Sequence, residues 1–192
     1  MSKFLYGINS FILIGALLYT YYGIKKKIEK DKEKRSAVAD LLSYFTVLSN
    51  ILVLFYWGLK IFEKDIIFLE APIRLYISIT CIVYCFILFP RWKPKGLYIL
   101  SNFIVHLYVP FIVWYNFIIE NQKNKISILE PIFWLIMPVI YLILVTIRGY
   151  KIKKYPYFFL DRKTIGNKKY VTFMVSLILL FIISGYIIYV IS

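Results

Sequence analysis

The chain has 192 residues, of which 61% are hydrophobic and 20% aromatic, and its formal net charge is +14. Its mean hydropathy is +0.73. An ordinary soluble domain contains about 45–50% apolar residues, so this composition excludes a soluble globular protein of this length. The lysines and arginines lie in the loops between apolar runs, which argues against binding to nucleic acid.

Apolar runs of about 20 residues, each bounded by charged residues, predict transmembrane helices. We expect an all-α fold in which a single polytopic domain, residues 1–192, forms a bundle of six transmembrane helices. The predicted spans are about 4–24, 38–59, 72–89, 97–119, 128–147 and 171–191. The first run is long for a signal peptide and no A-x-A-like cleavage site follows it, so we expect an uncleaved helix.

The second span carries a row of polar side chains. Asp40, Ser43, Thr46 and Asn50 recur every three or four positions, so on one helix they share a face. Such a face is costly against lipid and is therefore expected to point into the bundle. The densely charged residues 25–35 before it are expected to form a solvated helical extension of the first span.

The third and fourth spans contain the cysteines and the only histidine. Cys81 and Cys85 lie one helical turn apart with no further ligands nearby, so we expect them to pack as small hydrophobic side chains, and no metal site is predicted. In the fourth span, His106 lies between Asn102 and Pro110, each one turn away. An ionisable group at membrane depth is costly, so it is by default a functional-site hypothesis.

The distribution of lysine and arginine predicts the orientation of the protein. The loops at 25–37, 90–96 and 148–170 hold 18 of the 24 cationic residues. The positive-inside rule then places these loops in the cytoplasm and both termini outside the cell membrane. The aromatic stretch 155–161 in the last loop is expected to lie at the level of the lipid headgroups.

Under this topology the second and fourth helices run in the same direction, and two of their polar residues lie at matched depth. Thr46 precedes the centre of its helix by four residues and His106 precedes the centre of its own by two. At 1.5 Å per residue the depths differ by about 3 Å. A hydroxyl beside a neutral imidazole, which burial favours, is the minimal arrangement of a nucleophile and its general base.

Neighbouring residues fit supporting roles in the same chemistry. Asn50, one turn after Thr46, is a candidate donor to a developing oxyanion. Asn102, one turn before His106, is a candidate for orienting the imidazole. Further candidates for contact with a substrate are Ser43, Trp134 and Tyr141.

The same residue types also fit a purely structural interpretation. Serine and threonine in membrane helices commonly bond to the backbone of their own helix, and asparagine bridges neighbouring helices. The face that carries Trp134 and Tyr141 suits helix packing as well as an acyl pocket. Residue types alone leave these alternatives open.

Several motifs follow one another in a recognisable order. They are Tyr44-Phe-Thr-Val-Leu-Ser-Asn50, then His106 with Pro110, then Trp134, Pro138, Tyr141, Arg148-Gly149 and Tyr155-Pro-Tyr-Phe-Phe-Leu-Asp161. In this order and spacing the sequence resembles the bacterial six-helix membrane proteins related to the androgen-induced proteins and the androgen-dependent TFPI-regulating protein. The animal members of that family are intramembrane threonine hydrolases that cleave fatty acid esters of hydroxy fatty acids. The resemblance implies that Thr46 is the nucleophile and His106 the base.

The leading hypothesis is therefore an intramembrane lipid esterase that acts on hydrophobic fatty acyl esters and needs no cofactor. Its partners would be membrane lipids and a lipid ester substrate, and not nucleic acid. One alternative is a non-catalytic bundle that binds or transports a lipid or a proton. A third is a scaffold in which the polar residues only hold helices together. The sequence leaves the oligomeric state and the identity of the lipid open.

Overall fold

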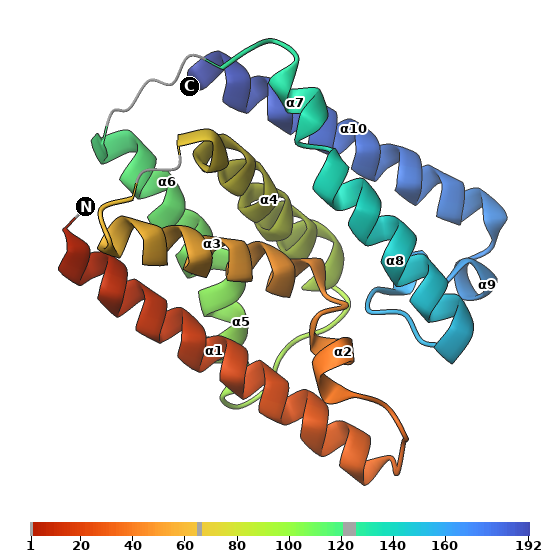
Figure 1. Cartoon of the computed structure of the whole chain (residues 1–192). Helices are drawn as coiled ribbons and strands as arrows, with labels where there is room; N and C mark the ends of the chain where they lie inside the picture. Colours follow the sequence, from red (N-terminus) through yellow and green to blue (C-terminus); the bar gives the residue numbers. More distant parts are fainter. Residues whose placement is uncertain (1, 65–66, 121–125) are drawn as a thin grey trace. The chain divides into compact units, whose positions relative to one another are not determined.

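The computed structural model of the protein describes residues 2–64, 67–120 and 126–192 (Figure 1). All secondary structure elements in these ranges are helices, which confirms the all-α prediction. The chain divides into two compact units, Met1–Asn124 and Lys125–Ser192. The prediction of a single domain stays a prediction, and residues 121–125 of the predicted loop after the fourth span lie outside the described residues.

Long apolar helices make this a multi-pass membrane protein. Five helical stretches are long and apolar enough to cross a membrane, namely Lys3–Lys30, Glu70–Leu88, Tyr98–Glu120, Glu130–Ile152 and Asn167–Ile191. The helix α3 (Phe45–Ile61) is apolar but has only 17 residues. At 1.5 Å per residue it is about 26 Å long, and a hydrocarbon core requires about 20 residues. The six predicted spans are thus confirmed only as five clear spans and one shorter apolar helix.

The helix predicted over the second span, 38–59, is wrong at its start, because the helix is interrupted between Leu41 and Phe45. The short helix α2 (Ala37–Leu41) ends where the Ser43 hydroxyl donates to the Asp40 carbonyl oxygen at 2.6 Å. Tyr44 is extended, with φ −91° and ψ 124°, and α3 begins at the next residue. A serine hydroxyl that bonds to the backbone competes with helix continuation, which accounts for the break.

In the first unit, α3 packs against two other helices. α1 (Lys3–Lys30) runs along one side of it and α4 (Glu70–Val83) packs against it as well (Figure 1). Since α1 extends to Lys30, the predicted helical extension into the charged segment is confirmed as far as that residue. The apolar core of the unit comprises Tyr6, Leu13, Ala16, Val53, Tyr56, Trp57, Ile73, Ile77, Val105, Val109 and Val113.

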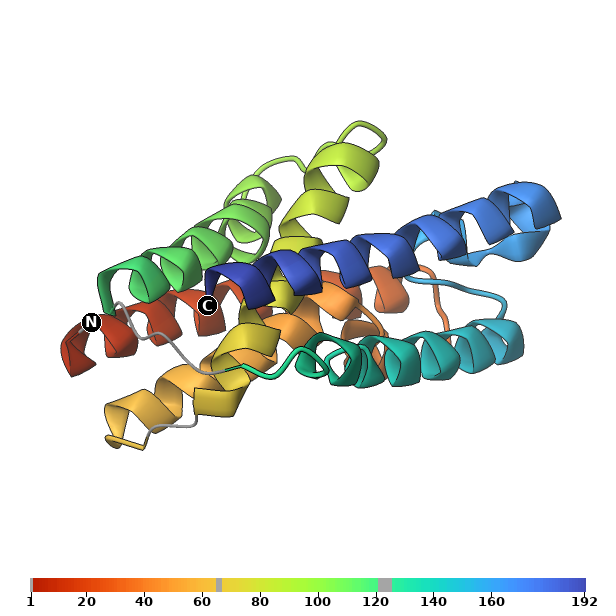
Figure 2. The ribbon, with the colours of Figure 1, turned by 90° about the horizontal axis from the view of Figure 1, so that it is seen from above.

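Two of the long helices contain a π-helical segment. α4 continues into η2 (Tyr84–Leu88), while α5 (Tyr98–Phe103), η3 (Ile104–Tyr108) and α6 (Val109–Glu120) form one continuous rod (Figure 2).

Each π segment ends two residues before a proline, Pro90 or Pro110. A proline lacks an N–H and its ring clashes with the carbonyl of residue i−4, so the wider π turn relieves the crowding. For Pro110 that residue is His106.

The second unit is built around α10 (Asn167–Ile191), which packs against α7 (Glu130–Phe133), η4 (Phe158–Leu160) and α9 (Arg162–Ile165). Between α7 and α8 (Ile136–Ile152) the helix is interrupted at residues 134–135. The interruption has a local cause. In a continuous helix the ring of Pro138 would clash with the carbonyl group of Trp134, four residues before it.

The loop of the second unit carries an aromatic cluster that packs on α10. The rings of Tyr157 and Phe159 are stacked with centroids 5.1 Å apart, and Phe159 also stacks on Phe173 of α10 at 5.6 Å. Tyr157 and Phe159 are buried. The cluster ties this loop to the start of α10.

We expect Asp161 to titrate below the ordinary aspartate pKa of about 3.9. Its carboxylate accepts a hydrogen bond from the Thr164 hydroxyl at 2.6 Å, and this bond lowers the pKa of Asp161. Asp161 is the N-cap of α9, and its side chain accepts hydrogen bonds from the backbone N–H groups of Lys163 and Thr164. Because its pKa is lowered by folding, this cap stabilises the protein above about pH 4, and the stabilisation is lost as pH falls through the folded-state pKa. An NMR titration of the carboxyl carbon measures this pKa. The Thr164→Val variant should raise it, and an unchanged value in that variant would contradict the assignment.

Candidate functional site

Thr46 and His106, predicted to lie at matched depth, are in contact. The Thr46 hydroxyl oxygen lies 3.3 Å from Nε2 of His106. Thr46 is the second residue of α3, while His106 is the central residue of the π segment η3. Both side chains are buried, with 8% and 7% of their surface exposed. The first turn of one helix and the π segment of another therefore bring a hydroxyl and an imidazole together.

The other ring nitrogen of His106 determines which nitrogen carries the proton. Nδ1 lies 3.0 Å from the backbone carbonyl oxygen of Asn102. A carbonyl oxygen can only accept, so Nδ1 must donate its hydrogen to it and Nε2 is left with its lone pair. The Thr46 hydroxyl can then donate to Nε2, which is the direction that proton transfer to a general base requires.

Tyr84 holds the plane of the imidazole. Its ring is stacked on the His106 ring, with centroids 3.9 Å apart and an angle of 19° between the planes. Tyr84 is the first residue of the π segment η2, and 5% of its surface is exposed. The imidazole is thus fixed by a contact at each nitrogen and by one on its face.

Asn50 joins α3 to η3. Its Nδ2 donates to the carbonyl oxygens of Thr46 at 2.7 Å and of Val105 at 3.1 Å. The Val105 carbonyl needs this donor because the N–H of Val109, its partner in a regular α-helix, bonds to Ile104 instead. Both amide hydrogens of Asn50 are therefore engaged. Its role as an oxyanion donor stays a prediction, and it requires one of these bonds to break.

We expect the Asn50→Leu variant to lose about 1–2 kcal/mol of unfolding free energy, because it leaves the buried Val105 carbonyl oxygen without a donor. Denaturant titration in detergent micelles measures the loss. Asn102→Leu is a matched control, because the Asn102 amide donates to the carbonyl oxygen of Tyr98 on its own helix, at 2.8 Å. Its loss should cost less than about 1 kcal/mol. Equal losses in the two variants would contradict the role of Asn50 as an interhelical clamp.

The other residues predicted for the site have different surroundings from those of Thr46 and His106. Ser43 is buried, but its hydroxyl donates to the Asp40 carbonyl and so caps α2. Asn102 contacts His106 through its backbone carbonyl and not through its amide. Trp134 and Tyr141 belong to the second unit, where Trp134 is buried and Tyr141 half-buried. The substrate contacts predicted for these residues stay predictions.

Sequence reasoning missed Tyr84 and the Ser49–Thr80 contact. The Ser49 and Thr80 hydroxyls lie 3.1 Å apart and join α3 to α4. A proline inside or directly after a predicted span indicates a local distortion of the helix, so Pro110 indicates one near His106 and Pro90 indicates one near Tyr84. Nothing in the sequence indicates that the segment with Tyr84 contacts the segment with His106.

A second polar cluster lies at the opposite end of α3. Lys60 Nζ lies 3.3 Å from Glu70 and 3.8 Å from Glu120, which come from α4 and α6. Tyr56 donates to Glu70 at 2.6 Å and Tyr6 donates to Glu120 at 2.8 Å. We call these five residues the ion network. It connects α1, α3, α4 and α6 at one end of the first unit.

Within the described part of the chain, no group of three or more histidine, cysteine, aspartate and glutamate residues could hold a metal ion. Cys81 and Cys85 are unbridged and half-buried. Comparisons with protein-family models, with curated proteins and with solved structures find no match to this chain.

Proposed function

We propose that this protein is an intramembrane lipid esterase in which Thr46 is the nucleophile and His106 the general base. The observation that carries the proposal is the 3.3 Å contact between the Thr46 hydroxyl and His106 Nε2, with Nδ1 bonded to the Asn102 carbonyl oxygen. A nucleophile within reach of a base that a third group orients is the general arrangement of this type of catalysis.

The proposed reaction proceeds through an acyl-enzyme. The Thr46 oxygen attacks the ester carbonyl carbon while His106 Nε2 takes the hydroxyl proton. The bond from that carbon to the alcohol oxygen then breaks, and His106 returns the proton to the departing oxygen. Water, deprotonated in turn by His106, attacks the acyl-threonine, releases the fatty acid and regenerates the hydroxyl. One ester and one water thus give one acid and one alcohol.

The position of Thr46 supports the charged step of this reaction. It lies in the first turn of a 17-residue helix, at the positive end of the helix macrodipole. Negative charge that develops on the attacked carbonyl oxygen is stabilised by a preorganised dipole of this kind.

The proposed substrate is a hydrophobic ester that enters laterally from the bilayer. Phe103 and Phe111, on either side of His106 in the same rod, are exposed, as expected of helices that face lipid. In the proposal Ser43, which belongs to the same unit as Thr46 and His106, contacts the substrate. We further propose that the protein is related to the bacterial relatives of the androgen-induced proteins.

We also propose that it lies in the cell membrane with its basic loops in the cytoplasm and both termini outside. The unequal distribution of lysine and arginine supports this orientation.

Covalent labelling of the detergent-purified protein with a fluorophosphonate tests the proposed function. An activated threonine attacks this electrophile, whereas a hydroxyl that merely bridges helices does not. Labelling of the wild type, followed by mass-spectrometric location of the adduct on Thr46, is the expected result. If the folded wild type remains unlabelled, the alternative of a non-catalytic bundle that binds or transports a lipid or a proton is favoured.

A further inference from the structure

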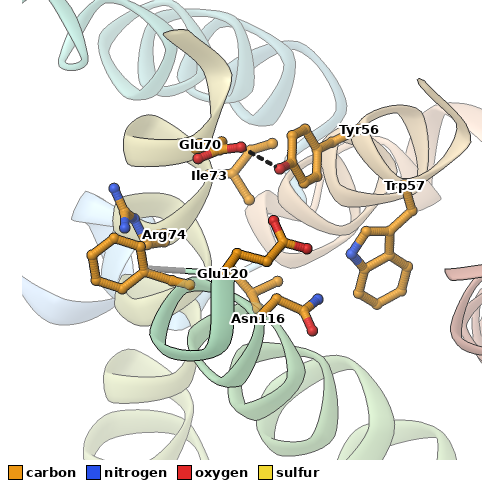
Figure 3. Close-up of a pocket in the computed structure, with 9 residues that line it drawn as sticks. Tyr56, Trp57, Glu70, Ile73, Arg74, Asn116 and Glu120 are labelled. Atoms are coloured by element: carbon orange, nitrogen blue, oxygen red, sulfur yellow. Dashed lines mark hydrogen bonds between the residues drawn. The ribbon is translucent and has the colours of Figure 1, made fainter. Parts of the chain in front are cut away.

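A small pocket lies in the first unit between α3, α4 and α6 (Figure 3). Its volume is about 30 Å³. A buried water needs about 10–15 Å³ measured in this way, so the pocket has room for about two water molecules and none for a lipid headgroup. Its wall includes Trp57, Asn116, Glu70, Glu120 and Arg74, so it adjoins the ion network.

Trp57 and Asn116 of the pocket wall each have a polar atom without a hydrogen-bond partner within the described part of the chain. They are the indole nitrogen Nε1 of Trp57 and the amide oxygen of Asn116. Trp57 is fully buried and Asn116 is 7% exposed, so bulk water does not reach them. Figure 3 shows the nitrogen edge of the Trp57 indole turned toward the side chains of Asn116 and Glu120. Buried polar groups nearly always have partners, and ordered water commonly provides them.

The two atoms together indicate what kind of molecule fits. The Trp57 N–H needs an acceptor, and the Asn116 oxygen needs a donor. An anion would satisfy only the first and a metal cation only the second, whereas water satisfies both.

The charges nearby also favour a neutral molecule. The carboxylates of Glu70 and Glu120 are opposed by Lys60, which contacts both, and by Arg74, whose guanidinium lies 3.6 Å from the centroid of the Phe117 ring. An anion in the pocket would meet the carboxylates of Glu70 and Glu120, and a metal cation would meet the guanidinium of Arg74, so each would lie near a charge of its own sign.

We propose that this pocket is an internal water site. Two bound water molecules accept a hydrogen bond from Trp57 Nε1, donate one to the Asn116 amide oxygen and extend to the carboxylates of Glu70 and Glu120. The ion network is thereby hydrated from inside the helix bundle. This inference is independent of the proposed esterase activity, since it concerns the other end of α3.

The test is water-to-protein magnetisation transfer by NMR on protein labelled with ¹⁵N-tryptophan in detergent micelles. The Trp57 indole N–H, assigned by its absence in Trp57→Phe, is expected to give a cross-peak with water. Trp114 is the internal control, because its indole N–H donates to the Ser78 hydroxyl at 2.9 Å and should give none. A soluble gadolinium chelate should leave the Trp57 cross-peak unchanged, because the water is bound inside.

Variants of Asn116 complete the test. Asn116→Leu fills the pocket and should remove the cross-peak, while Asn116→Asp keeps an acceptor and should retain it. A folded wild type without the cross-peak, or a cross-peak that the chelate removes, overturns the proposal. A cross-peak that persists in folded Asn116→Leu overturns it as well. If Asn116→Leu does not fold, the comparison of Trp57 with Trp114 in the wild type still decides.

Discussion

Replacing His106 by alanine should lower ester hydrolysis about 10²–10⁴-fold, which is the usual contribution of a general base. Fluorophosphonate labelling should fall with it. Thr46→Ala should abolish labelling altogether, because it removes the attacking oxygen. Labelling rates measured by mass spectrometry and hydrolysis of a panel of fatty acyl esters are the two readouts. Each variant must first show the size-exclusion profile and melting temperature of a folded protein.

Two matched variants separate catalysis from packing. Thr46→Ser retains a hydroxyl beside His106 and should keep measurable labelling. Ser49 is a second buried hydroxyl, three residues further along α3 and bonded to Thr80. Ser49→Ala removes an oxygen of the same kind and should leave labelling unchanged. Labelling that survives in folded Thr46→Ala would show that the nucleophile is another residue.

The largest loss of stability is expected from Lys60→Met. Lys60 is 8% exposed and contacts the side chains of Glu70 and Glu120, which are 10% and 18% exposed. Its removal leaves two nearly buried carboxylates without their shared counter-charge. Breaking a buried ion pair in this way costs about 3–5 kcal/mol. Denaturant unfolding in micelles, followed by helical circular dichroism, measures the change.

A surface ion pair at the same end of the unit provides the control. Lys3 and Glu63 form a salt bridge, but their side chains are 56% and 73% exposed. Lys3→Met should therefore change the unfolding free energy by less than about 1 kcal/mol. Double-mutant cycles of Lys60→Met with Glu70→Gln and with Glu120→Gln should give the larger coupling for Glu70, the closer partner. Equal effects of Lys60→Met and Lys3→Met would contradict the assignment of the ion network as a buried element.

Hydrophobic length and charge made much of the architecture predictable. An apolar run long enough to cross the hydrocarbon core predicts a helix, because only a helix satisfies every backbone group there. The long helices of the structure follow these runs to within a few residues at most ends. The predicted second span failed at residues 42–44, because hydrophobicity averaged over a span does not register one serine that bonds to a nearby carbonyl.

The candidate site was only partly accessible from the sequence. Matched depth predicted that Thr46 and His106 are close, and they are in contact. Their surroundings were not predictable, because the imidazole is oriented by a backbone carbonyl and by Tyr84, and neither contact has a sequence signature. Asn50 was identified as a polar residue of the inner face. Its partner, the Val105 carbonyl, became available only because the π turn before Pro110 shifts the hydrogen-bond register.

The sequence by itself determined the fold class, the approximate helix positions and the inward direction of Thr46 and Asn50 on α3, since each depends on local hydrophobicity and helical period. Asp40 and Ser43, predicted to share that face, precede α3, because the helix is interrupted after Leu41. The tertiary structure decided which polar groups meet. Tyr6 and Glu120 are 114 residues apart in the chain, and Asn50 and Val105 are 55 apart. Such contacts depend on how separate helices pack, and a buried polar group in a membrane helix finds its partner wherever packing brings a complementary atom within hydrogen-bond distance.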